Sequence, residues 1–117
     1  MQNYKELKVW EKVHLFTLQV YESTKLFSKE ELYGLTTLLR RSASSIPANI
    51  AEGCGKKGNQ EFAHFLNIAL GSANESEYFP ILSKDLTYLK IVNFEILFSI
   101  INEVKTMLIA LIAKVRA

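Results

Sequence analysis

The sequence predicts an all-α protein, a single domain of four helices covering residues 1–117. The chain has 117 residues, of which 49% are hydrophobic, and this is enough for one core but not two. Five glycines and two prolines leave few breaks. Leu, Ile, Ala, Lys and Glu dominate the long uninterrupted stretches, a composition typical of helices. The strict apolar and polar alternation of a β-strand is nowhere sustained.

The first helix is predicted over residues 4–26, where apolar side chains recur at helical spacing and form one broad face. Trp10 is the expected anchor of this face, and charged residues fall away from it. Residues 27–30 then read as a short connection. Ser28 is a plausible N-cap, and Glu31 three residues later completes a capping-box pattern. The predicted face consists of Val9, Trp10, Val13, Phe16, Val20 and Tyr21.

The second helix is predicted over residues 29–54 and contains a proline. Pro47 has no N–H to donate to the carbonyl of Ala43, so the helix is expected to kink there. Nearby serine hydroxyls are expected to satisfy the backbone groups that the proline frees. Gly53 or Gly55 is the expected C-cap. The core-facing stripe consists of Leu32, Leu35, Leu39, Ala43, Ile46 and Ile50, and the serines are Ser42, Ser44 and Ser45.

A polar line runs beside that stripe at spacings of three and four residues, which places it on one flank of the helix. It is either the solvated edge of the helix or a surface that meets a partner. A buried polar network that sets the register of the second and third helices is the preferred interpretation. The line contains Arg41, Ser45, Asn49, Glu52 and Lys56, and the candidate network contains Ser45, Asn49, Glu52, Ser72 and Glu75.

The third and fourth helices are predicted over residues 59–89 and 93–115. Asn59 is the expected N-cap of the third helix, and Pro80 is expected to bend it. The fourth helix is apolar over most of its girth, and one bundle of this size can cover only one side of it. We therefore expect a homo-oligomer in which the fourth helix contributes much of the interface.

The charge pattern leaves two readings of the basic residues open. A net charge of +2 is too small to indicate a nucleic-acid-binding protein by itself. Residues 31–58 carry a net charge of +2, whereas residues 59–89 carry −3. Arg40, Arg41, Lys56 and Lys57 could form a basic patch that contacts phosphate groups. The alternative is that Arg41 pairs with Glu52 or with the acidic third helix.

No catalytic constellation is expected. Glu-x-x-His occurs at Glu11–His14 and Glu61–His64, the spacing of di-iron bundles, but these side chains do not face the predicted core. Cys54 has no identifiable catalytic partner. The glycines around Lys56 and Lys57 lack the spacing of a phosphate-binding loop. The sequence thus predicts no enzyme activity, no cofactor and no metal site.

The chain is expected in the cytoplasm and away from membranes. Cys54 is the single cysteine, so no intramolecular disulfide can form, and the first residues lack the apolar run of a signal peptide. The longest apolar run, residues 107–113, is far short of the ~20 residues that cross a bilayer.

Four segments together resemble the bacterial four-helix proteins encoded within 23S rRNA intervening sequences. They match in order and spacing over residues 7–89, and the most specific part is the RR-to-SIPANIAEG core followed by FLNIALGS. Thr87 stands where this family usually has glycine. The segments are LKVWEK (7–12), LYGLTTLLRRSASSIPANIAEG (32–53), EFAHFLNIALGSANESE (61–77) and DLTYL (85–89).

This resemblance implies an up-down four-helix bundle that assembles into a cyclic oligomer, a pentamer, without enzymatic activity. The family's link with rRNA, and its similarity to the accessory variability proteins of diversity-generating retroelements, imply nucleic-acid binding by a basic surface. Arg40, Arg41, Lys56 and Lys57 are the candidates that this implies. The alternative is a scaffold that holds a partner protein and binds no nucleic acid.

Overall fold

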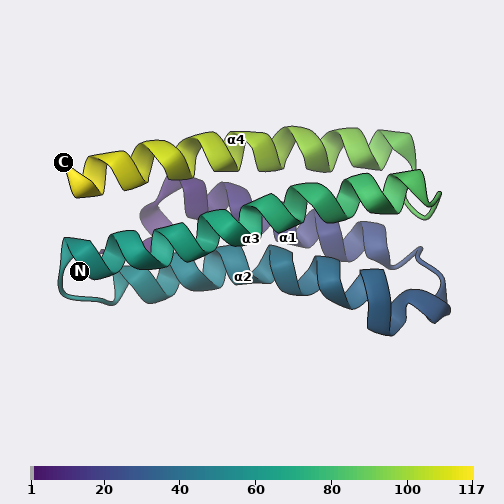
Figure 1. Ribbon diagram of the computed structural model, residues 1–117, viewed down its shortest axis with the longest axis horizontal. Helices are drawn as coiled ribbons and strands as arrows, with labels where there is room; N and C mark the ends of the chain where they lie inside the picture. The colour runs from purple at the N-terminus through teal and green to yellow at the C-terminus, as the bar shows by residue number, and fades with distance from the viewer. Residues whose placement is uncertain (1) are drawn as a thin grey trace.

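The computed structural model describes residues 2–117 and contains four long helices and no strand within them. The helices lie side by side along a molecule about 43 Å long (Figure 1). Both chain termini and the α2–α3 connection lie at one end, and the other two connections lie at the opposite end. The all-α four-helix prediction is confirmed. The helices are α1 (Lys8–Thr24), α2 (Thr37–Cys54), α3 (Asn59–Asp85) and α4 (Ile91–Arg116).

Three short helical turns complete the chain, and two of them change the predicted second helix. These are η1 (Tyr4–Glu6), η2 (Lys29–Glu31) and η3 (Leu32–Thr36). Gly34, inside η3, has φ −112° and ψ −115°, which is not helical. The predicted helix over residues 29–54 is therefore interrupted, and α2 begins only at Thr37. Leu32, predicted in the core stripe, is exposed as a result.

Each helix packs against two neighbours, so that α2 and α4 lie diagonally across the bundle. α1 contacts α2 and α4, and α3 contacts the same two helices. All four contribute fully buried side chains to one core, and the predicted α2 stripe from Leu39 onward is among them. The largest are Phe16, Leu39, Ile46, Ile50, Leu66, Leu97, Ile101 and Leu108.

Several helix ends differ from the predictions. Ser28 caps η2, accepting the Glu30 N–H at 3.2 Å, but Glu31 does not complete a capping box. Its carboxylate accepts the Leu35 N–H instead. The cap of α3 is Gly58 rather than Asn59, because Gly58 is the last residue with extended backbone.

The connection between α3 and α4 is longer than predicted. α3 ends at Asp85 rather than near residue 89, and α4 begins two residues earlier than expected, at Ile91. Thr87, in this connection, has φ 68°, a left-handed conformation that glycine adopts without steric cost and a β-branched residue does not. Gly55 is the C-cap of α2, which confirms one of the two predicted positions.

The carbonyl that Pro47 leaves without a helical donor is satisfied from α1. The Thr17 hydroxyl donates to Ala43 O at 3.3 Å and shares this donor with Val13 O at 2.9 Å. One turn away, Trp10 Nε1 donates to Pro47 O at 3.2 Å. The expectation that nearby serines do this is wrong. Ser42 and Ser44 bond to the ordinary helical carbonyls of Leu39, Arg40 and Arg41.

Pro47 and Pro80 both lie inside helices, and the kinks at these two residues remain predictions.

One helix of residues 2–117, α4, is long and apolar enough to cross a membrane by length and composition alone. Its buried stripe faces the bundle, and large apolar side chains such as Ile96 and Ile109 are exposed on its remaining surface. Leu15 and Leu18 of α1 are exposed as well.

Replacing Thr17 with valine tests the role of the Ala43 carbonyl. T17V should reduce the free energy of unfolding by about 1–3 kcal/mol, because it leaves this carbonyl buried without a donor. P47A supplies a helical N–H, so the same substitution should cost about 1 kcal/mol less in a P47A background. Urea unfolding of the unmodified protein, T17V, P47A and the double variant measures the cost of T17V in each background.

The control is T106V, which removes a hydroxyl bonded to an ordinary helical carbonyl on the exposed side of α4. It should change stability by less than about 0.5 kcal/mol. An equal cost of T17V with and without Pro47 would contradict the assignment.

Candidate nucleic-acid interface

The adjacent arginines of α2 point to different neighbours, because successive helix positions are about 100° apart. Arg40 turns toward α1: its Nε donates to Thr24 Oγ1 at 2.8 Å, and its guanidinium lies 4.7 Å from the Tyr21 ring centroid. Arg41 is exposed and lines a groove of about 260 Å³ between α2 and α3, which also contains Glu75. The two arginines therefore belong to separate surfaces.

Lys56 and Lys57 lie in the connection between α2 and α3, far from both arginines. Fifteen residues separate Arg41 from Lys56, which corresponds to roughly 22 Å along a helix axis. The Lys56 ammonium lies 5.3 Å from the ring centroid of Phe65. The structure thus does not bring the four basic candidates into one patch.

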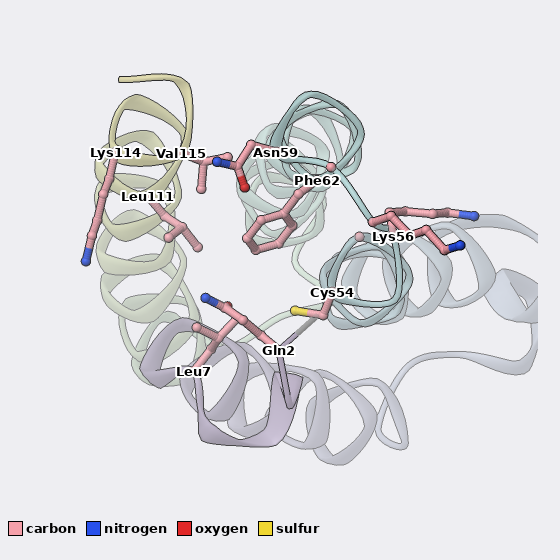
Figure 2. A pocket seen from close by; sticks show the side chains of 12 residues that line it. Gln2, Leu7, Cys54, Lys56, Asn59, Phe62, Leu111, Lys114 and Val115 are labelled. Atoms are coloured by element: carbon pink, nitrogen blue, oxygen red, sulfur yellow. The ribbon is translucent and has the colours of Figure 1, made fainter.

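A cavity of about 370 Å³ opens at this end of the bundle, beside Lys56 and Lys57. Figure 2 shows the Phe62 ring and the Cys54 sulfur directed toward its interior, with Leu111 and Val115 of α4 on the other side. Lys56 and Lys114 stand on opposite sides of the opening and extend outward from it. The cavity therefore has an apolar interior and a basic rim.

Two basic residues at this end were missed by the sequence reasoning. Lys114 lines the cavity, and Arg116 lines the adjoining hollow with Gln60 and Val115. Both come from the last turn of α4. In an up-down bundle the last turn of the fourth helix lies beside the α2–α3 connection. The predicted topology was therefore sufficient to place Lys114 and Arg116 near Lys56 and Lys57. We call Lys56, Lys57, Lys114 and Arg116 the basic end.

None of the basic end takes part in an ion pair within residues 2–117. The four ion pairs there are Lys12–Glu103, Lys25–Glu22, Lys84–Asp85 and Lys105–Glu77. The predicted alternative, a pair between Arg41 and Glu52, is absent from this set. The three ammonium groups and the guanidinium of the basic end are consequently available to an external anion, although Glu52 and Glu61 are also exposed nearby in sequence.

Three of the five candidate network residues come together between α2 and α3. Ser72 Oγ donates to Ser45 Oγ at 2.9 Å, and Asn49 Nδ2 donates to the same oxygen at 3.0 Å. Glu52 and Glu75 are exposed, and their side chains make no hydrogen bond within residues 2–117. These hydrogen bonds join α2 to α3, and their role is structural.

The sequence reasoning also missed a second hydroxyl pair in this helix interface. Ser76 Oγ donates to Ser42 Oγ at 3.1 Å, where both side chains are buried. Near the end of α2, a Cβ on Gly53 would lie 2.9 Å from the Cβ of Phe65. Small residues on α2 thus allow a close approach of α3.

The two Glu-x-x-His motifs do not converge. His14 stacks on Trp10 with ring centroids 5.1 Å apart, and His64 lies edge-on to Phe65. Over residues 2–117, no three His, Cys, Asp or Glu side chains gather where they could hold a metal ion.

Cys54 forms part of the cavity wall but is only 3% exposed. Burial raises the pKa of its thiol above the usual value. Since the thiolate is the reactive form, the raised pKa disfavours nucleophilic chemistry at this position.

The sequence profile of the family described as 23S rRNA-intervening sequence protein matches residues 5–110. A similar solved structure is that of a protein with unknown function from the S23 ribosomal protein family of Bacteroides thetaiotaomicron VPI-5482. It is 28% identical, with a TM-score of 0.80 over 89% of this chain and 97% of the other. No curated protein matches this sequence.

The Cys54 thiol should react slowly with iodoacetamide in the folded protein. At about pH 8 the raised pKa leaves less thiolate than in the unfolded chain, and the side chain is shielded as well. Mass spectrometry should show alkylation that is at least about tenfold faster in denaturing urea. Equal rates in the two conditions would show that the thiol is neither buried nor perturbed.

Proposed function

Because the chain belongs to the 23S rRNA-intervening sequence protein family, we propose that it is a non-catalytic helical-bundle protein that binds structured RNA through phosphate contacts. The contacts are assigned to the basic end. The observation that carries the proposal is the gathering there of Lys56, Lys57, Lys114 and Arg116 from two separate elements, none of them in an ion pair within residues 2–117.

Physical chemistry favours phosphate as the partner of this surface. Lysine and arginine side chains that neutralise phosphates release condensed counterions, and this supplies affinity without reading sequence. Lys56 and Lys114 extend outward on either side of the cavity (Figure 2), so they can reach two phosphates of one backbone. Arg41 is exposed but lies far from the basic end, and no phosphate contact is assigned to it.

We further propose that the chain acts as a homo-oligomer, a pentamer by the family resemblance, in the cytoplasm. Ile96 and Ile109 of α4, with Leu15 and Leu18 of α1, leave apolar surface exposed on the single chain. A second copy would cover it. In a ring whose copies all point the same way, the basic ends lie on one rim. Several weak phosphate sites would then act together.

A protein-interaction scaffold is the second candidate function, and exposed apolar residues at the other end of the bundle favour it. Tyr33 is 92% exposed and Leu26 is 70% exposed, both near the α1–α2 connection. Exposed aromatic and aliphatic side chains of this kind are typical of protein contacts. A scaffold with no RNA affinity is the outcome that would replace the first proposal.

Titration with rRNA fragments at several salt concentrations tests the phosphate contacts. The logarithm of the affinity should fall linearly with the logarithm of the salt concentration. Replacing Lys56 and Lys57 together with glutamine should reduce the magnitude of this slope by about 2, because each lost phosphate contact removes about 1. Fluorescence anisotropy with labelled RNA measures the slope.

The matched control is the double substitution K84Q and K90Q, which removes two lysines beside the α3–α4 connection at the opposite end. It should leave the slope unchanged. Absence of RNA binding at low salt, or an equal effect of both double variants, would rule out the basic end.

Native mass spectrometry tests the self-association. The unmodified chain should be a stable oligomer. The double substitution I96K and I109K should shift it toward monomer, because charged side chains are costly in an apolar interface. The control A48K adds a charge on the exposed side of α2, diagonally opposite α4, and should leave the oligomer intact. A monomeric unmodified chain would contradict the proposal.

A further inference from the structure

A small hollow lies where α1 ends and α2 begins, at the opposite end from the basic end. Its volume is about 170 Å³. No carboxylate lines it. The polar side chains of its lining are those of Thr24, Lys25, Ser28, Lys29, Thr36 and Arg40.

Arg40 is held at the hollow with its terminal nitrogens unused. Its Nε donates to Thr24 Oγ1, and the Thr24 hydroxyl in turn donates to Val20 O at 2.8 Å. The Tyr21 ring supports the guanidinium plane at 4.7 Å. The two terminal nitrogens have no hydrogen-bond partner within residues 2–117. A guanidinium fixed in this way presents the planar fork that suits a phosphate or carboxylate oxygen pair.

Thr36 supplies a second hydrogen-bond donor at the hollow. Its side chain is only 4% exposed and lines the hollow, yet its hydroxyl makes no hydrogen bond within residues 2–117. A helical threonine commonly bonds the carbonyl four residues back, here that of Leu32. That carbonyl accepts from the hydroxyl of Thr37. No side-chain polar atom of residues 2–117 is both buried and without a partner, so this hydroxyl is open to the hollow and free to donate to an oxyanion there.

The carboxylates of residues 22, 30 and 31 do not line the hollow. Glu31 accepts the Leu35 N–H at 3.1 Å and the Tyr88 hydroxyl at 3.4 Å. The negative charge of Glu31 also raises the pKa of Tyr88. Glu22 pairs with Lys25 at 3.0 Å, and both of those side chains are largely exposed. Glu30 is exposed and does not line the hollow. The polar side chains of the lining are cations and hydroxyls, and Phe27 and Leu32 complete it.

We propose that this hollow binds one phosphate group. Arg40 donates to two of its oxygens, Thr36 donates to a third, and Lys29 adds positive charge. The site is separate from the basic end and does not depend on RNA being the partner of that end. A phosphate of an RNA backbone and a free phosphate ester present the same oxygens to it.

The first test uses the full chain, labelled with nitrogen-15, and inorganic phosphate at constant ionic strength. Nitrogen–proton correlation spectra should show saturable shifts at Arg40 Nε–H and at the backbone amides of residues 36 and 40. R40Q should weaken phosphate affinity by about tenfold, and T36V by about threefold. The matched control R41Q removes the neighbouring arginine, which points to the α3 side, and should leave the affinity unchanged.

The T36V variant keeps the test decisive if R40Q disturbs the α1–α2 contact, since valine has nearly the shape of threonine. Absence of saturable shifts would overturn the proposal. So would an R41Q effect as large as that of R40Q, or unchanged affinity in a folded T36V.

A second arm distinguishes the sources of the phosphate. A short RNA that shifts the same signals at lower concentration than inorganic phosphate assigns the site to RNA. Shifts by phosphate alone assign it to a free phosphate ester. Either result can be obtained whether or not the Lys56 and Lys57 substitutions change the salt slope of RNA binding. Failure of the phosphate site at the hollow can therefore be distinguished from failure of RNA binding at the basic end.

Discussion

The carbonyl oxygen of Ala43, which Pro47 leaves without a helical donor, constrains how α1 and α2 pack. A buried carbonyl needs a donor, and Thr17 of α1 supplies one at 3.3 Å. The Trp10 indole makes a second contact to the same helix at Pro47 O. These two bonds fix the distance and register of α1 against α2. At its interface with α3, α2 presents serine hydroxyls and Gly53, whose small size allows the two helices to approach closely.

This arrangement of α2 decides where positive charge is presented. Because one side of the helix packs on α1 and another on α3, the consecutive arginines divide between the two interfaces. Arg40 lies against Tyr21 and Thr24, whereas Arg41 lies in the groove beside Glu75. The helix then ends at Cys54, and Lys56 and Lys57 of the following connection lie near the last turn of α4 at one end of the bundle. That end is the surface we assign to RNA phosphates.

The spacing of apolar residues was sufficient to predict four helices and most of the core, because buried positions on a helix recur with its own period. The spacing was not sufficient at Gly34. The apolar pattern runs across this residue from Leu32 to Leu35, yet the backbone of Gly34 is not helical and interrupts the helix. The serine pairs were only partly predicted, since Ser45 and Ser72 could be proposed from polarity but Ser42 and Ser76 depend on which faces meet. Lys114 and Arg116 join the site only through topology. The Thr36 hydroxyl lacks an intramolecular partner while Thr37 donates to the Leu32 carbonyl, a choice of side-chain geometry that the sequence does not show.

The most direct test of the central claim is lysine acetylation of the full chain, read by mass spectrometry with and without an rRNA fragment. The account predicts that RNA protects Lys56, Lys57 and Lys114 from acetylation, while Lys90 at the opposite end stays as reactive as in the free protein. Equal protection of Lys90, or no protection of the basic end under conditions where RNA is bound, would contradict it.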